Sequence, residues 1–361
     1  MPVNKDPQRI LILRLSSLGD VILTSAVVGA LKKALPGTEL FFLTKEVYAP
    51  IYDEDPRIEE VIVYPSTGRG LQRLVRVIKD IRQIGFDLVI DLHGTPRSRV
   101  IAGLSGARRK VTWKKERFRR EWMIRFQRGF VRPVVERYLE CAGRGIGRRL
   151  TGRPEVVVSD DAQRRIEEVF IRRGIIQGAE VAIVCPGARW ATKRWREEGF
   201  AEVADVMTER YGYRVLLLGD VNDRPTVERV RDMVKGEAVD LTGELSLKEF
   251  VAAIDRASVV VCNDSAPIHI ALARGTPVVA IFGPTHPGLG FVGPGESMQV
   301  VRVDVPCSPC SLHGERLCRQ ERRMCMEDVT VEEVIHQVHT VLLRNVHKKP
   351  LGTGRTILID K

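Results

Sequence analysis

The chain has 361 residues and a net charge of +11, with 44% hydrophobic and 29% charged residues. This length is expected to divide into two domains, and the composition is that of a folded globular protein rather than a disordered one. No apolar run reaches the roughly 18–20 residues of a membrane span, and Arg14 and Asp20 interrupt the first run, unlike in a signal peptide. We therefore expect a cytoplasmic protein with reduced cysteines.

Most of the positive charge belongs to one segment, residues 97–153. It holds eighteen Lys or Arg and four Glu, a net charge of +14, so the rest of the chain has a net charge of −3. A basic surface of this kind can face nucleic acid, an anionic membrane or a phosphorylated substrate. Five aromatic residues are interleaved with the charges: Trp113, Phe118, Trp122, Phe126 and Phe130. They suit contact with a membrane interface at least as well as stacking on bases.

Along the first half of the chain, short apolar runs alternate with helical patterns. We expect strands at residues 10–15, 40–44, 61–64, 87–91 and 110–112, and helices at 21–35, 48–51, 71–84, 133–141 and 160–173. Residues 143–152 read as irregular. Strands that alternate with helices predict a parallel, doubly wound sheet.

A second series of the same kind follows a Gly-rich turn at residues 174–178. Strands are expected at 181–185, 214–219, 239–241, 259–262, 277–282 and 300–303, with helices at 196–210, 224–234, 247–256 and 331–343. The predicted domains are residues 1–175 and 176–345, followed by a flexible tail, 346–361. The expected fold class is α/β, with two facing Rossmann-like parallel-sheet domains and a cleft between them.

The stretch from residue 259 to 285 predicts an anion site. Its apolar strand ends at Asn263-Asp264-Ser265, which are N-cap residue types, Pro267 follows early in a helix, and Gly275 ends that helix. The first turn of the helix would present free N–H groups and the positive end of its dipole at the carboxyl edge of the sheet. The alternative is an ordinary crossover whose caps are only caps.

Four stretches carry a resemblance to a known family. They are Leu13-Arg14-Leu15-Ser16-Ser17-Leu18-Gly19-Asp20, Asp91-Leu92-His93-Gly94 with Arg97-Ser98, Pro186-Gly187-Ala188 with Lys193-Arg194-Trp195, and Asn263-Asp264-Ser265-Ala266-Pro267 with His269 and Phe282-Gly283-Pro284-Thr285. In type, order and spacing they resemble glycosyltransferase family 9, the bacterial lipopolysaccharide heptosyltransferases with the GT-B fold. The resemblance implies an inverting transfer of L-glycero-D-manno-heptose from ADP-heptose to the lipopolysaccharide inner core. The third stretch favours the heptosyltransferase II type, which adds the second heptose.

Two residues are implied to carry the chemistry. An inverting transfer needs a base for the attacking hydroxyl, and Asp20, which follows Gly19 at the start of the predicted helix, matches the family's catalytic aspartate. The helix N-terminus would lower its pKa and make it a weak base, which is tolerable if proton transfer is late. Lys193 matches the lysine that contacts the diphosphate and would neutralise the leaving ADP. The alternatives are an Asp that only begins a helix and a surface lysine.

The resemblance also implies residues for both substrates. Donor-binding residues would be Gly187, Gly219, Asp220, Thr242, Asp264, Ser265 and Ala266. The last three would offer backbone N–H groups to the diphosphate, Asp220 would bind the ribose, and the adenine would pack near Thr242. The chain has Ser-Ala-Pro where relatives often have Thr-Gly, and Pro267 removes one N–H.

The anionic acceptor would be bound by Arg97 and Arg99, because the arginine fork suits phosphate and carboxylate groups. His93 precedes them and is either an acceptor-binding residue or a structural hydrogen-bonding one. His269 is expected to be a packed, hydrogen-bonded residue rather than a base.

A C-x2-C-x7-C-x6-C run of cysteines lies near the C-terminus, at Cys307, Cys310, Cys318 and Cys325. Such a run can hold structural zinc, but the second pair is too widely spaced for a usual zinc ribbon. Reduced thiols in a loop are the favoured interpretation. No metal at the active site and no cofactor are expected.

Two other functions are compatible with parts of the sequence. A nicotinamide-dependent oxidoreductase could have such domains, but no G-x-G-x-x-G opens either one. A non-catalytic nucleic-acid-binding protein could use residues 97–153, but no nucleic-acid motif is found. The expected partners are ADP-heptose, an anionic lipopolysaccharide acceptor and, as a hypothesis, an anionic inner-membrane surface on which this cytoplasmic protein would be peripheral. Nucleic acid is not expected as a partner.

Overall fold

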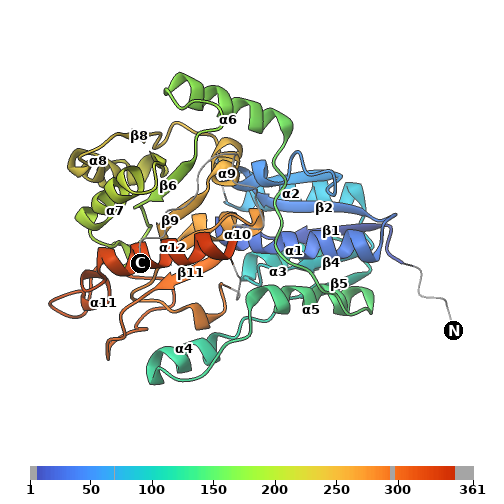
Figure 1. The fold of residues 1–361 in the computed structure, drawn as a ribbon. Helices are drawn as coiled ribbons and strands as arrows, with labels where there is room; N and C mark the ends of the chain where they lie inside the picture. The colour runs from blue at the N-terminus through green and yellow to red at the C-terminus, as the bar shows by residue number, and fades with distance from the viewer. Residues whose placement is uncertain (1–5, 69, 293–296, 346–361) are drawn as a thin grey trace.

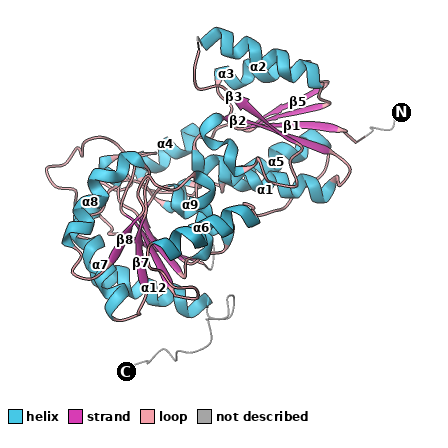
Figure 2. Ribbon diagram, turned by 90° about the horizontal axis from the view of Figure 1, so that it is seen from above, coloured by secondary structure: helices cyan, strands magenta, loops and turns pink. Residues whose placement is uncertain are grey.

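The computed structural model describes residues 6–68, 70–292 and 297–345, which form two α/β domains beside each other (Figure 1). Each domain has one sheet of parallel strands, in the order β3-β2-β1-β4-β5 in the first and β11-β10-β9-β6-β7-β8 in the second. Seen from above, the two sheets lie apart and each is flanked by helices (Figure 2). The alternation of strands and helices in the sequence therefore predicted the architecture.

The first sheet is built from residues before 113. Its elements are β1 (Arg9–Leu13), α1 (Leu18–Ala34), β2 (Glu39–Lys45), the 3-10 helix η1 (Glu46–Ile51), β3 (Glu60–Tyr64), α2 (Gly70–Ile84), β4 (Leu88–Asp91), α3 (Pro96–Leu104) and β5 (Arg109–Thr112). Strands β1, β2 and β4 are buried along almost their whole length, as expected for parallel strands covered on both faces. Helices α4 (Arg117–Phe126) and α5 (Val134–Ile146) follow.

The second sheet is built from residues 181–301. Its strands are β6 (Val181–Cys185), β7 (Arg214–Leu217), β8 (Ala238–Asp240), β9 (Val259–Asn263), β10 (Val278–Ile281) and β11 (Met298–Val301). The helices are α6 (Asp160–Arg172), α7 (Glu197–Glu209), α8 (Arg224–Met233), α9 (Leu247–Arg256), α10 (Ala266–Arg274), α11 (Met324–Glu327) and α12 (Val331–Asn345), with 3-10 turns η2 (Ala191–Lys193), η3 (Val221–Asp223) and η4 (Pro287–Leu289). None of the helices within the described residues is both long and apolar enough to cross a membrane.

Every predicted strand lies within two residues of its observed ends. Two helices of the basic segment, α3 and α4, were not predicted. The prediction of an irregular stretch at residues 143–152 is wrong at its start, because α5 continues to Ile146. Two glycines let the helix pass close to its neighbours: a Cβ on Gly143 would collide with the carbonyl oxygen of Arg148, and one on Gly145 would lie 3.0 Å from a methyl carbon of Leu88.

The strand order places the carboxyl ends of β1 and β4 side by side in the first sheet, and those of β6 and β9 in the second. Leu13 pairs with Asp91, and Cys185 pairs with Cys262. In both sheets the order of strands reverses at this pair, so the loops that follow diverge and leave a crevice, which is where open α/β sheets bind ligands. The segments that follow these strands contain Asp20, His93, Lys193 and Asp264, whereas Gly219, Asp220 and Thr242 follow the neighbouring strands β7 and β8.

The two domains meet where helix α1 of the first packs against helix α10 of the second. Helix α6 packs against α9 of the second domain, so the chain has passed to that domain before residue 160. The predicted boundary between residues 175 and 176 stays a prediction, and the predicted flexible tail, residues 346–361, lies outside the described residues.

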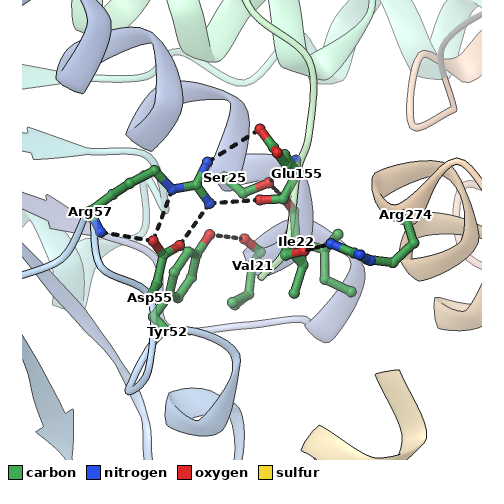
Figure 3. Close-up of polar contacts among 9 residues, drawn as sticks. Val21, Ile22, Ser25, Tyr52, Asp55, Arg57, Glu155 and Arg274 are labelled. Carbon is green, nitrogen blue, oxygen red and sulfur yellow. Dashed lines mark hydrogen bonds and ion pairs between the residues drawn. The ribbon is translucent and has the colours of Figure 1, made fainter. Parts of the chain in front are cut away.

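The segment that crosses between the domains is held from both sides (Figure 3). Glu155 donates its N–H to Ser25 Oγ at 2.8 Å, and its carbonyl oxygen accepts from Arg57 at 2.9 Å. From the second domain, Arg274 donates to the Val156 carbonyl oxygen at 2.6 Å. Arg57 is itself fixed by the carboxylate of buried Asp55, at 2.7 Å. The crossing segment is thus part of the packed structure.

Arg57→Ala is expected to lower the free energy of unfolding by about 1–3 kcal/mol, because the Asp55 carboxylate then loses its partner in a buried position. Urea unfolding would measure this. Arg164→Ala removes an exposed arginine from its pair with Asp161 and should change stability by less than about 0.5 kcal/mol. Equal effects of the two substitutions would contradict the role given to Arg57.

Candidate active site

Asp20 lies in the first turn of α1, at the edge of the crevice of the first domain. Its carboxylate forms an ion pair with Arg14 and accepts hydrogen bonds from Ser17 Oγ at 3.1 Å and from the Tyr138 hydroxyl at 3.4 Å. Burial acts to raise the pKa of Asp20, but the charge of Arg14 and the bonds from Ser17 outweigh it, so the pKa is lowered. The carboxylate is therefore ionised and held in a fixed orientation.

Arg14 is the group that fixes this carboxylate. It follows β1 directly, is buried, and donates to the Leu92 carbonyl oxygen at 2.6 Å and to the Tyr138 oxygen at 2.7 Å. Burial opposes its charge, yet the pKa of Arg14 is raised because Asp20 lies beside it. No role was predicted for Arg14, although an arginine at the end of an otherwise apolar strand is the signal that could have found it.

On the facing side of the cleft, Lys193 and Asp264 form an ion pair of 2.7 Å, and each side chain is 14% exposed. The Thr285 hydroxyl donates to the same oxygen of Asp264 at 2.6 Å. Lys193 closes the 3-10 turn η2 after β6, and Asp264 follows β9, so the switch point of the second sheet brings them together. The ammonium group is thus held at the cleft by a carboxylate.

Asn263, the last residue of β9, joins the two loops of this switch point. Its amide nitrogen donates to the Pro186 carbonyl oxygen at 2.7 Å, and its amide oxygen accepts from the Trp195 N–H at 3.0 Å. Both ends of the Asn263 amide are therefore used, and the loop that carries Lys193 is fixed relative to α10.

The start of α10 differs in one respect from the prediction. The N–H of Asp264 donates to the Ile281 carbonyl oxygen at 3.0 Å, so in this structure it is not free for a phosphate. Ser265 is the N-cap and Ala266 the first helical residue, and Gly275 ends the helix with φ 73°, as expected. The predicted backbone donors are reduced to Ser265 and Ala266, for which the role stays a prediction.

Helices α1 and α10 touch through Gly19 and His269. A Cβ on Gly19 would lie 2.8 Å from Nε2 of His269. Burial lowers the pKa of His269 although the carboxylates of Asp264 and Asp20 act to raise it, so the imidazole is neutral at pH 7. It is packed, as predicted, but its Nδ1 is buried without a hydrogen-bond partner in the described structure. This contact between the two helices brings Asp20 near the Lys193–Asp264 pair.

The Cys-rich segment, residues 307–325, forms a further wall of this site. A Cβ on Gly314 would lie 2.8 Å from Cδ of Lys193, and the N–H of Glu315 donates to Thr192 Oγ1 at 2.8 Å. His313 lies next to them, and burial lowers the pKa of its imidazole. The charges that act on it further include Asp20, Lys193 and Asp264. Sequence reasoning considered only the thiols of this segment and missed its histidine.

No chemical role is assigned to the thiols of this segment. All seven cysteines are free. Within the part of the chain that the structure describes, no three His, Cys, Asp or Glu side chains are arranged to hold a metal ion.

His93 lies on the same side of the cleft as Asp20. Its backbone N–H donates to Asp91 Oδ1 at 2.9 Å, which fixes the loop after β4. Burial, followed by the charges of Arg14 and Lys115, lowers the pKa of His93 to about 4, so the imidazole is neutral. Lys115 was not predicted, and its signal in the sequence is lost among the many basic residues around it.

The two predicted acceptor arginines lie at the exposed start of α3. Arg97 lies over the ring of Tyr64, 5.6 Å from its centroid, and both Arg97 and Arg99 are exposed. The positive charges that act on His93 come instead from Arg14, Lys115 and Lys45.

The other residues predicted to bind the donor follow three adjacent strands, β6, β7 and β8. Gly187 and Gly219 both pack against the side chain of Asp223, whose pKa is raised by burial. Asp220 is exposed, and its Oδ1 accepts from the Asn222 N–H at 2.6 Å. Thr242 is buried, and its Oγ1 has no hydrogen-bond partner in the described structure. The structure therefore places these four predicted residues along one edge of the second sheet.

Two solved structures with the same architecture are glycosyltransferases. A glycosyltransferase of family 9 from Veillonella parvula is 25% identical, with 94% of this chain and 98% of the other covered and a TM-score of 0.79. The ADP-heptose heptosyltransferase II of Escherichia coli is 21% identical, with 93% and 99% covered and a TM-score of 0.72. The fold is therefore GT-B, as predicted, with its cleft between two parallel-sheet domains.

The family follows from the sequence comparison. A family model described as glycosyltransferase family 9 (heptosyltransferase) matches residues 74–319. Lipopolysaccharide heptosyltransferase 1 of Pseudomonas aeruginosa is 26% identical, with 93% of this chain and 98% of the relative covered. The chain belongs to glycosyltransferase family 9 and is an enzyme of that class. Neither the oxidoreductase nor the non-catalytic nucleic-acid binder is retained.

The lowered pKa of His93 predicts a pH dependence of stability. The pKa of a histidine is about 6.5 in the unfolded chain and about 4 here, so between these values the unfolded chain binds more protons and stability rises with pH. His93→Gln should reduce that slope by up to about 1.4 kcal/mol per pH unit, less for the partial exposure of the ring. Urea unfolding from pH 4.5 to 7 would measure it. Parallel profiles of the two proteins would contradict the assignment.

Proposed function

We propose that the enzyme transfers a heptosyl residue from ADP-heptose to a sugar of the lipopolysaccharide core, with inversion at the anomeric carbon. The observation that carries this proposal is the contact of helix α1, which bears Asp20, with His269 of helix α10, which begins beside the Lys193–Asp264 pair of the other domain. Relatives named as lipopolysaccharide heptosyltransferases support the choice of sugar and acceptor.

The donor would lie along the second domain. Its diphosphate would face Lys193 and the N–H groups of Ser265 and Ala266, because a lysine and a helix N-terminus both favour phosphate. The ribose would reach Asp220, and the adenine would lie near Thr242, where a buried hydroxyl lacks a partner. Asp264 holds Lys193 and would lie nearest to the sugar.

The reaction would proceed in one displacement. The acceptor hydroxyl oxygen forms a bond to C1 of the heptose, the bond from C1 to the diphosphate oxygen breaks, and its electron pair leaves with ADP. Asp20 accepts the hydroxyl proton, and its negative charge, like that of a glycosidase carboxylate, stabilises the oxocarbenium-like sugar. Because Arg14 lowers the pKa of Asp20, proton transfer would be late, after the oxygen has begun to bond to C1.

The acceptor would enter over the first domain. His93, as a neutral hydrogen-bonding group, and Lys115 would line its path beside Asp20, with Arg97 and Arg99 at the exposed rim. These cations suit the phosphate and carboxylate groups of an anionic inner core. The enzyme would act at the cytoplasmic face of the inner membrane. The stretch Pro186-Gly187-Ala188 with Lys193-Arg194-Trp195 favours addition of the second heptose. The first acceptor to test is therefore an inner core that lacks the second heptose.

Asp20→Asn is expected to lower kcat by about 10² to 10⁴, the usual contribution of a general base. Asparagine keeps the shape and can still accept from Ser17, so ADP binding measured by calorimetry should stay within about twofold. Residual turnover within tenfold of the wild-type rate, in a protein that still binds ADP, would rule out Asp20 as the base.

Lys193→Ala is expected to weaken ADP-heptose binding by about ten- to a hundredfold, because a hydrogen bond from a charged group is worth about 1.5–3 kcal/mol. Lys235→Ala, at an exposed position of the same domain, serves as the matched control. The double variant with Asp264→Asn separates loss of the ammonium from the repulsion left by an unpaired carboxylate. If Lys193→Ala binds ADP as tightly as the control does, the diphosphate lies elsewhere.

A further inference from the structure

Helix α4 carries a stripe of large aromatic side chains on its outer face. Phe118, Trp122 and Phe126 are spaced four residues apart, which places them on one face of a helix. They are 87%, 60% and 50% exposed, and Phe130, just beyond the helix, is 66% exposed. The rings of Trp122 and Phe126 lie 4.2 Å apart. We call these four residues the α4 stripe. Contiguous apolar surface of this kind marks an interaction site.

The charges around the α4 stripe are mainly positive. By helical position, Arg119 and Arg125 flank it, and both are exposed, as are Arg117 and Arg128. The one exposed carboxylate of the helix is Glu121. An amphipathic helix with Trp and Phe on its apolar face and arginines beside them is typical of helices that lie in the interface of an anionic bilayer.

The opposite face of α4 is fixed to the second domain, so the stripe cannot turn inward. Met123 is buried with Val131 and Leu289. Arg120 is also buried: it donates to the Leu289 carbonyl oxygen at 3.1 Å, and its guanidinium lies 4.3 Å from the ring centroid of Phe291. The helix projects at the lower edge of the molecule in Figure 1, away from both sheets.

The same contacts connect α4 to the active site. The ring of Phe291, which Arg120 covers, lies 5.6 Å from the ring of His313, and Asp20 is among the charges that act on Arg120. A planar surface that held the α4 stripe would therefore lie near the cleft.

We propose that the α4 stripe and its arginines form a docking surface for an anionic lipid bilayer. A single convex helix suits a plane, whereas proteins that bind single-stranded nucleic acid line a groove with their aromatic and basic residues. The inference goes beyond the proposed reaction, and it does not depend on it, because bilayer binding is measured without turnover.

The first test is flotation of the full chain with vesicles of phosphatidylcholine, alone or with phosphatidylglycerol. Binding is expected to the anionic vesicles at low salt and to fall in about 0.5 M salt, where charge attraction is screened. Trp122 reports the contact directly, since Trp113 and Trp195 are buried and Trp190 is half-buried. Brominated lipids should quench the wild-type fluorescence, and Trp122→Phe should remove most of that quenching.

A triple variant, Phe118→Ala, Trp122→Ala and Phe126→Ala, should lose at least about tenfold in partitioning to anionic vesicles. The matched control replaces three exposed apolar residues elsewhere, Leu71, Ile171 and Ile176, by Ala and should bind like the wild type. Both variants should keep wild-type turnover on a soluble, deacylated acceptor.

Three results would overturn the proposal: no binding of the wild type to anionic vesicles at low salt, equal loss in the control variant, or binding of an RNA oligomer that depends on the stripe while vesicles do not bind. Vesicle binding without any heptosyl transfer would instead contradict the proposed reaction and leave this surface standing.

Discussion

The buried ion pair between Arg14 and Asp20 is the interaction on which the first half of the site depends. Burial acts to raise the pKa of this carboxylate, and the charge of Arg14, together with the hydrogen bonds from Ser17, outweighs that effect and keeps it ionised. The guanidinium is in turn held by a backbone carbonyl and by Tyr138 of helix α5, so a residue far along the chain helps to fix the carboxylate. Because the same arrangement lowers the pKa of Asp20, the proposed base role requires a late proton transfer.

The second half of the site depends on a different device, the Asn263 amide that bridges two loops of one sheet. Because it uses both its donor and its acceptor, the lysine loop and the start of α10 are fixed as a unit. The two halves then meet through helices α1 and α10. The segment that crosses between the domains is bound by Arg57 of the first domain and Arg274 of the second. Each domain thus fixes its own half of the candidate site, and the contact between the domains brings the two halves together.

Much of this could be predicted from the sequence. Continuous apolar runs located central strands such as β6 and β10, because strands buried on both faces tolerate little else. The motif residues located Asp20, Lys193 and Asp264, since loops at the carboxyl ends of parallel strands converge. Helix α4 could not be found in the same way: its buried face includes Arg120, which is satisfied by a carbonyl and an aromatic ring of the other domain, and no local pattern reveals such a partner. His313 was missed because its place is set by contacts of Gly314 and Glu315 with another loop.

Gly19 allows helices α1 and α10 to pack closely against each other. The imidazole of His269 already occupies the space in which a side chain at position 19 would begin, because a Cβ at that position would collide with its Cδ2. A larger residue at position 19 would have to displace this imidazole, and with it the contact between the two helices through which the domains meet. Position 19 therefore sets how closely the two domains can pack at this contact.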